Sequence, residues 1–155
     1  MRRLLLSAFG LGRIPPIPGT YASAATVLAV LAVHGLAFGP TTPLPWALLA
    51  FGVLATLALG NGLSTPDGHG DPGWVVTDEV AGQALALIVA TASSSAGGGW
   101  LAGLSFVLFR VLDMTKPGVI GVAERLPGGL GILCDDLVAG ALAGVIAGGL
   151  GSLVT

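Results

Sequence analysis

Residues 132–140 read ILCDDLVAG and place two adjacent carboxylates, Asp135 and Asp136, immediately before a long apolar segment. That segment, LVAGALAGVIAGGLGSLVT at 137–155, contains no charged side chain. A charged group beside hydrocarbon is costly, so an ionisable residue in such a place usually has a function. The stretch therefore predicts a membrane helix with a functional acidic pair at its start.

The composition of the whole chain also favours a membrane protein. Of its 155 residues, 54% are hydrophobic and only 9% are charged, whereas a soluble domain has roughly 25% charged residues. Mean hydropathy is +0.92. The 26 glycines would allow helices to approach each other closely in lipid. We therefore expect a single all-α domain over residues 1–155, embedded in a membrane.

Apolar stretches predict about five hydrophobic helices. They lie at 21–39, 45–63, 80–92, 100–112 and 137–155. The third and fourth are shorter than the roughly 20 residues that span a bilayer, so they would tilt, thin the bilayer or extend into polar residues buried in protein. Residues 1–12 are expected to form a short amphipathic helix at the membrane surface.

The charges are predicted to lie on one face of this domain. If each stretch crosses once, the N-terminus and the connections 64–79 and 113–136 share a side. That side would carry all six basic and all eight acidic residues. They are Arg2, Arg3, Arg13, Asp67, Asp71, Asp78, Glu79, Arg110, Asp113, Lys116, Glu124, Arg125, Asp135 and Asp136. Arg110 belongs to this side because it lies in the last turn of the fourth predicted helix, next to the connection 113–136. Basic residues mark the cytoplasmic side of a membrane protein, which places this face in the cytoplasm.

Two acidic pairs within this set suggest a cation site. Asp78–Glu79 is expected to begin the third helix and Asp135–Asp136 the fifth. Four carboxylates would repel one another unless a cation lay between them. Mg²⁺ prefers carboxylates, water and substrate phosphate as ligands. The predicted metal ligands are therefore Asp78, Glu79, Asp135 and Asp136.

Basic residues near these acids suggest a phosphate substrate. Arg110 and Asp113 are three residues apart and share a helix face, and Lys116 follows. Arg110 and Lys116 are suited to bind phosphate oxygens. In the loop GLGRIPPIPGTYAS at 10–23, Arg13 adds positive charge. Thr20 and Ser23 are expected to precede and cap the first helix, whose N–H groups could face an anion.

The remaining polar residues suggest ordinary structural roles. His34 is expected within the first span, where it would form a hydrogen bond between helices rather than bind a metal. Glu124 and Arg125 are expected to form an exposed pair. A serine or cysteine nucleophile paired with histidine is not apparent.

Four motifs together resemble the membrane-bound bacterial phosphatidylglycerophosphatase A family. They are GLGRIPPIPGTYAS at 10–23, DPGWVVTDEVAG at 71–82, FRVLDMTKPGVI at 109–120 and GGLGILCDDLVAG at 128–140. The resemblance extends over nearly the whole chain. It implies an all-helical domain of the bacterial inner membrane that uses Mg²⁺ to convert phosphatidylglycerophosphate into phosphatidylglycerol.

The resemblance also implies which residues form the site. Asp78 and Glu79 match the first acidic motif and Asp135 and Asp136 the last, while three residues match FR-x-x-D-x-x-KP: Arg110, Asp113 and Lys116. Thr20 and Ser23 match PGT-x-x-S, and Ala22 departs from the glycine expected between them.

We therefore predict a Mg²⁺-dependent lipid phosphatase whose partners are an anionic phospholipid and the membrane, and no nucleic acid. The predicted catalytic residues, which would orient water or attack phosphorus, are Asp78, Glu79, Asp113 and Asp136. The predicted substrate-binding residues are Arg110, Lys116, Thr20, Ser23 and Arg13.

Two other functions stay open. Lipid phosphotransferases that use a nucleotide-linked alcohol also place aspartates near membrane helix ends, but their glycine-spaced aspartate motif is not matched here. A cation- or proton-coupled transporter could use the same acids, although transporters tend to carry polar groups near the midplane rather than at one face.

Overall fold

The computed structural model describes residues 1–63, 72–94 and 98–154. Its helices, in chain order, are α1 (Arg2–Leu6), η1 (Ala8–Arg13), α2 (Pro18–His34), η2 (Gly35–Ala37), α3 (Pro43–Leu59), α4 (Thr77–Ala92), α5 (Gly98–Thr115), α6 (Val119–Ala123) and α7 (Gly129–Ser152). Within these ranges there is no β-strand, so the predicted all-α class is confirmed. Asp67 and Asp71, predicted on the charged face, lie outside the described residues.

The longer helices α2, α3, α4, α5 and α7 coincide with the five predicted apolar stretches. Among the described residues, however, two segments are both long and apolar enough to cross a membrane: Pro18–Ala37 and Gly129–Ser152. Helix α3 is apolar but shorter, at 17 residues. The structure thus shows a helical bundle with two candidate membrane helices.

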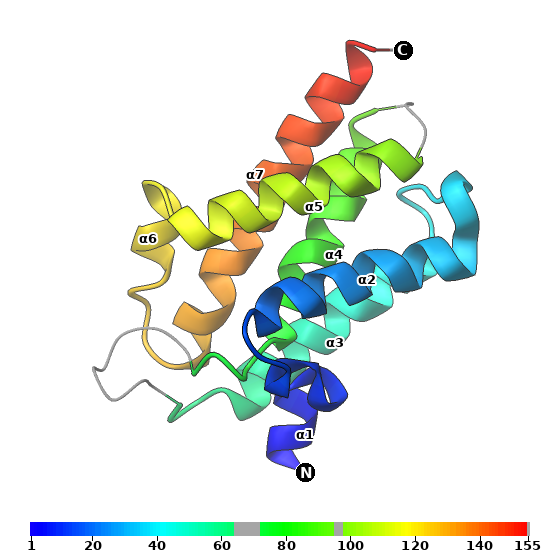
Figure 1. Cartoon of the computed structure of the whole chain (residues 1–155). Helices are drawn as coiled ribbons and strands as arrows, with labels where there is room; N and C mark the ends of the chain where they lie inside the picture. Colours follow the sequence, from blue (N-terminus) through cyan, green and yellow to red (C-terminus); the bar gives the residue numbers. More distant parts are fainter. Residues whose placement is uncertain (64–71, 95–97, 155) are drawn as a thin grey trace.

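Helix α4 lies at the centre of the bundle (Figure 1). It contacts α2, α3, α5 and α7. Most of its side chains are buried, and alanine and glycine make up much of its length. Small side chains let neighbouring helices approach closely, and a central position buries the whole circumference. The first turn of α4, which carries Asp78 and Glu79, is therefore surrounded by other helices.

The contact between α4 and α7 depends on glycines. Gly140, Gly144 and Gly148 recur at every fourth position and so lie on one face of α7. A Cβ atom on Gly140 would collide with the backbone carbonyl of Gly82 in α4. The two backbones are therefore in direct contact, which brings residues of α7 close to the start of α4.

Helix α7 begins earlier than predicted. Its first residue is Gly129, so Asp135 and Asp136 lie inside the helix and not at its start. The N–H of Gly129 donates to Asn61 Oδ1 at 3.1 Å, which fixes this end beside α3. The prediction ended apolar segments at charged residues. It was wrong here because a carboxylate buried between helices need not interrupt one.

Helix α2 also begins earlier, at Pro18, where the fixed φ of proline suits the first helical turn. Thr20 and Ser23 are therefore inside the helix, and the prediction that they cap it is wrong. Ser23 is buried and donates from Oγ to the carbonyl of Gly19 at 2.9 Å. His34 is the last residue of α2, and its buried Nε2 has no hydrogen-bonding partner among the described residues. The predicted bond between helices is therefore not made through Nε2.

The predicted surface helix at 1–12 is present as two shorter pieces, α1 and η1. Leu6 is fully buried, and its carbonyl accepts a hydrogen bond from the N–H of Val76 at 2.9 Å. Val76 directly precedes α4. The N-terminal segment thus holds the start of α4 in place.

Candidate active site

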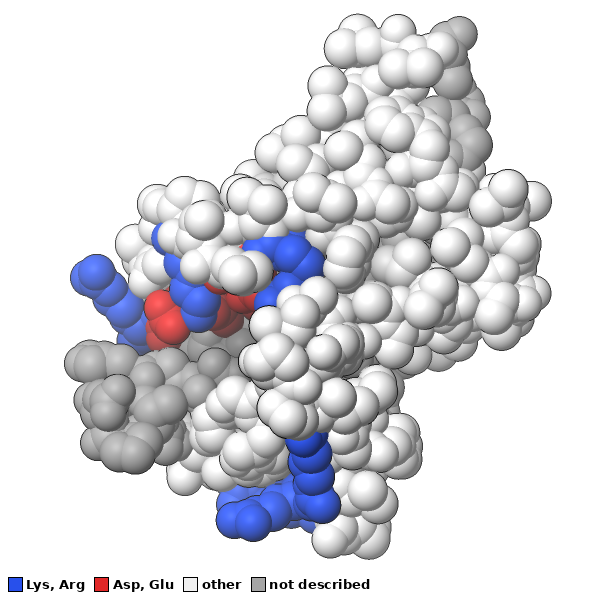
Figure 2. Space-filling model, viewed as in Figure 1, with Lys and Arg blue, Asp and Glu red and all other residues white. Residues whose placement is uncertain are grey.

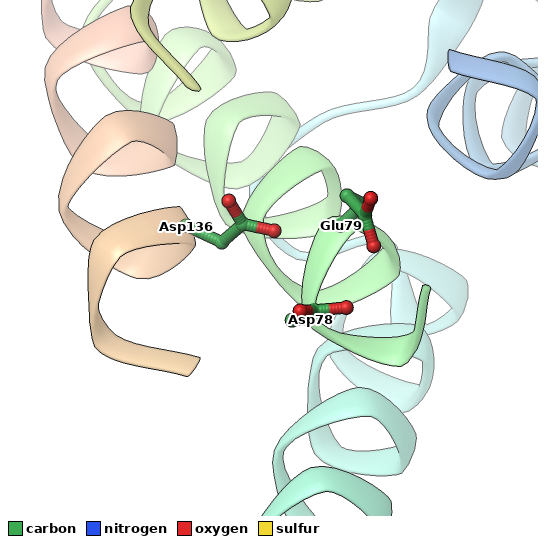
Figure 3. Close-up of side chains that lie close together, drawn as sticks. All are labelled: Asp78, Glu79 and Asp136. Carbon is green, nitrogen blue, oxygen red and sulfur yellow. The ribbon is translucent and has the colours of Figure 1, made fainter. Parts of the chain in front are cut away.

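Three carboxylates from two helices meet near the start of α4 (Figure 3). Asp78 and Glu79 come from the first turn of α4, and Asp136 points toward them from α7. Each offers an oxygen that lies within 4.8 Å of the others. Asp78 and Asp136 are each only 3% exposed. Residues far apart in the sequence thus form one buried, oxygen-rich group.

A second group shares Asp136 with the first. Oxygens of Asp113, Asp135 and Asp136 also lie within 4.8 Å of one another. The four predicted metal ligands are therefore divided between two neighbouring groups, with Asp135 beside Asp113 rather than among the acids of α4. Asp136 joins the two groups.

Two basic residues neutralise the second group. Arg110 Nη1 lies 2.6 Å from Asp113 Oδ2, which confirms that these residues share a face of α5. Lys116 Nζ lies 2.7 Å from Asp135 Oδ2 and 2.7 Å from Glu124 Oε1. Figure 2 shows red and blue atoms gathered in one hollow, whereas most of the visible surface is white. A further blue group lies near the N-terminal end.

Lys116 is held in an unusual conformation. Its φ is +44°, in the left-handed region that residues other than glycine rarely adopt. Although burial opposes its charge, the hydrogen bonds to Asp135 and Glu124 raise the pKa of Lys116 above its ordinary value. The ammonium therefore stays charged at neutral pH. The predicted Glu124–Arg125 pair is wrong, because Glu124 turns to Lys116 and Arg125 is exposed.

The start of α2 forms another wall of the site. A Cβ atom on Gly19 would collide with the carboxylate of Glu79 and lie 3.2 Å from Arg110 Nη1. The PGT motif is thus placed beside the acids through its glycine. Sequence reasoning missed Gly19, although its place between Pro18 and Thr20 in the motif offered a clue.

Arg13 has a different position from the other predicted substrate-binding residues. It is exposed and lines a shallow hollow of about 370 Å³ together with residues of the proline-rich loop and Trp74. Pro18, next to Gly19, also borders this hollow. Arg13 therefore lies on a neighbouring surface, and its predicted role stays a prediction.

The donor set suits a hard divalent cation. Five carboxylates converge in these two groups, and two of them are paired with Arg110 and Lys116. The first group, Asp78, Glu79 and Asp136, offers oxygen ligands only, which is the chemistry that Mg²⁺ prefers. Asp78 and Glu79 also lie at the positive end of the α4 dipole, which favours their charged forms.

The fold and site define an all-helical, strongly apolar protein with a buried carboxylate cluster flanked by cations. The chain matches the family model described as phosphatidylglycerophosphatase A over residues 4–150, and it belongs to that family. A phosphatidylglycerophosphatase A of Escherichia coli is 36% identical over 92% of this chain and 80% of its own length. A phosphatidylglycerophosphatase A of Haemophilus influenzae is 35% identical over 92% of this chain and 84% of its own length.

A third relative carries a different name. A Bacteroides thetaiotaomicron protein, provisionally named a phosphatidylinositol-3-phosphatase, is 33% identical over 88% of this chain and 85% of its own length. No solved structure matches the chain. All three names describe phosphatases, so the chain is an enzyme of this kind, and the transporter alternative has no support. Together with the two apolar helices, the family indicates a membrane protein.

Proposed function

We propose that this enzyme hydrolyses the terminal phosphate of phosphatidylglycerophosphate, giving phosphatidylglycerol and inorganic phosphate, and that it requires Mg²⁺. The observation that carries the proposal is the convergence of Asp78, Glu79 and Asp136 beside Arg110. The names of the E. coli and H. influenzae relatives support this substrate.

Arg110 and Lys116 would bind the phosphoryl oxygens. Arginine has five N–H donors and lysine three, more than their acidic partners use. Arg110 Nε is buried and has no hydrogen-bonding partner among the described residues. A phosphate oxygen would satisfy it and would gain the strength of a charge-assisted hydrogen bond. Both residues would also stabilise the charge that develops during phosphoryl transfer.

Asp78, Glu79 and Asp136 would hold the cation. When bound, Mg²⁺ supplies positive charge to the phosphate and makes water more acidic. Asp135 holds Lys116 through Oδ2, while its buried Oδ1 has no hydrogen-bonding partner among the described residues. Asp135 lies in the second group, beside Asp113 and Asp136, so its main role would be to hold Lys116.

One carboxylate of the cluster would accept a proton from the attacking water or would itself attack phosphorus. Asp113 lies against Asp135 and Asp136 and is oriented by Arg110, so it is held firmly at the site. In the first route, water displaces the lipid alcohol, which leaves with a proton, and phosphate is released directly. In the second route, the alcohol leaves with a proton as a carboxyl phosphate forms, and water then hydrolyses that intermediate to phosphate and the free carboxylate. The acyl chains would remain in the bacterial inner membrane while the head group reaches the site from the cytoplasmic face.

Phosphate release from purified protein in lipid micelles tests this function. Phosphatidylglycerophosphate with Mg²⁺ should yield phosphate, and chelation should stop the reaction. Asp78→Asn, Asp113→Asn and Asp136→Asn should each abolish release while the protein stays folded. Arg125→Gln, an exposed change outside the site, should leave the rate unchanged.

Two results would contradict the proposal. Full activity in all three variants would refute the site. Faster hydrolysis of phosphatidylinositol 3-phosphate or phosphatidic acid would refute the substrate while leaving the site intact.

A further inference from the structure

Two carboxylates hold the Lys116 ammonium. Glu124 Oε1 and Asp135 Oδ2 each lie 2.7 Å from Nζ. A lysine ammonium has three N–H donors, so one remains for another acceptor. The two acids differ in position, since the Asp135 side chain is 7% exposed and that of Glu124 33%. Lys116 is thus held between the interior of the site and its rim.

Glu124 is itself held in place by the fold. It follows α6, the short helix that reverses the chain between α5 and α7. Ile120 of this helix is fully buried and packs in a cluster with Phe109 and Ala139. The position of Glu124 is therefore set by the same helices, α5 and α7, that carry Arg110 and Asp136.

We infer that Glu124 is a positioning residue, which aims the remaining N–H of Lys116 at the phosphate of the substrate. The inference rests on the proposed function. Lysine is long and flexible, so with Asp135 as its single partner the ammonium would sample several orientations. With two partners, and with the backbone of Lys116 fixed at a positive φ, its direction is determined.

Charge repulsion alone predicts that neutralising Glu124 would have the opposite effect on phosphate binding from the loss of a positioning residue. Glu124 is negatively charged near a site for a phosphate anion, so its neutralisation should reduce repulsion and tighten phosphate binding. If Glu124 positions Lys116, its neutralisation should weaken phosphate binding instead. The sign of the change therefore separates the two explanations.

Glu124→Gln tests this inference, with Glu124→Asp as the conservative variant and Arg125→Gln as the control. KM and kcat are measured with phosphatidylglycerophosphate, together with competitive inhibition by inorganic phosphate. In Glu124→Gln, KM and the phosphate inhibition constant should rise about tenfold, as for weakening one charge-assisted hydrogen bond. Glu124→Asp should recover part of the loss. An unchanged or lower inhibition constant in Glu124→Gln would overturn the inference.

A double variant tests whether Glu124 acts through Lys116. In the Lys116→Ala background, Glu124→Gln should have no further effect on KM, because the group that it orients is gone. An equal loss in both backgrounds would overturn the inference and indicate a structural role. Thermal denaturation of each variant shows whether it is folded. If Glu124→Gln is not folded, the KM and phosphate inhibition constant of Glu124→Asp decide the outcome.

Direct binding of inorganic phosphate separates this inference from the proposed function. If the wild-type protein does not hydrolyse phosphatidylglycerophosphate but binds phosphate more tightly than Glu124→Gln does, the proposed substrate fails and the positioning role stands. If the wild-type protein is active and Glu124→Gln matches it in both measurements, the positioning role fails alone.

Discussion

At the scale of single residues, the absence of a Cβ atom at Gly19 leaves room for the carboxylate of Glu79. An added methyl would meet the end of the Glu79 side chain, which is flexible and can move aside. We predict that Gly19→Ala keeps its thermal stability but loses at least about tenfold in kcat/KM, since even small displacements of site groups are costly. Enzyme assays and thermal denaturation measure both effects.

The control for this prediction is Gly103→Ala in α5. Gly103 is exposed, and a Cβ atom there would have no neighbour within 4 Å. This variant should gain about 1 kcal/mol from helix propensity and keep full activity. Equal activity in the two variants would mean that the position of Glu79 does not matter for catalysis.

Gln83 is a buried polar residue that we expect to weaken the fold. It is fully buried, and neither amide atom has a hydrogen-bonding partner among the described residues. Methionine has a similar length without the polar atoms. Gln83→Met should therefore raise the free energy of unfolding by about 1 kcal/mol, measured by denaturation in detergent. Lower stability would show that the amide has a partner in the folded protein.

The residues with the least ambiguous chemistry were predictable from the sequence. Carboxylates are rare in this chain, so the acidic residues of the site are conspicuous in the sequence itself: Asp78, Glu79, Asp113 and Asp136. The role of Glu124 was not predictable, because a partner eight residues away across a turn follows no helical spacing. Its contact with Lys116 depends on the path of α6, which hydrophobicity does not reveal.

At the scale of helices, the contact between α4 and α7 determines the distance between the acids. A methyl on Gly140 would meet the backbone of Gly82, which cannot move aside as a side chain can. We predict that Gly140→Ala lowers the free energy of unfolding by about 1–3 kcal/mol and also reduces activity, because the helices must separate. The free energy of unfolding, measured by denaturation, and the rate of phosphate release should therefore decrease together.

Gly149→Ala in the same helix is the matched control. Its position is exposed, and an added Cβ atom would have no neighbour within 4 Å. It should be neutral or slightly stabilising. If Gly140→Ala behaved in the same way, the close approach of α4 and α7 would not be required.

Helix existence could be predicted better than helix boundaries. Apolar runs identified all five longer segments, because burial and lipid exposure both select hydrophobic residues. The starts of α2 and α7 were misplaced for a physical reason. Pro18 initiates a helix instead of preceding it, and buried carboxylates such as Asp136 are tolerated inside one when cations lie nearby.

At the scale of the whole molecule, the site depends on segments distant in sequence. The start of α2, the first turn of α4, the end of α5 and the first half of α7 all contribute to it. The sequence predicted that these segments share one face. It could not predict that Asp136 would lie between the two carboxylate groups, since this depends on how α7 packs against α4.

This architecture predicts that a divalent cation stabilises the whole fold. An ion held by Asp78, Glu79 and Asp136 would link α4 to α7 and offset the repulsion among the carboxylates. Since the ion would bind the folded state, stability should increase with its concentration, by about 2.7 kcal/mol at 100 times Kd. Thermal denaturation in detergent should show a rising Tm with Mg²⁺.

Asp136→Asn separates specific binding from a general salt effect. Without the ion this variant should be at least as stable as the wild-type protein, because one buried charge has been removed from a repulsive group. It should then lose the response to Mg²⁺ while keeping any response to NaCl. A Mg²⁺-dependent Tm of the same size in Asp136→Asn would place the cation elsewhere, and the proposed site between α4 and α7 would be wrong.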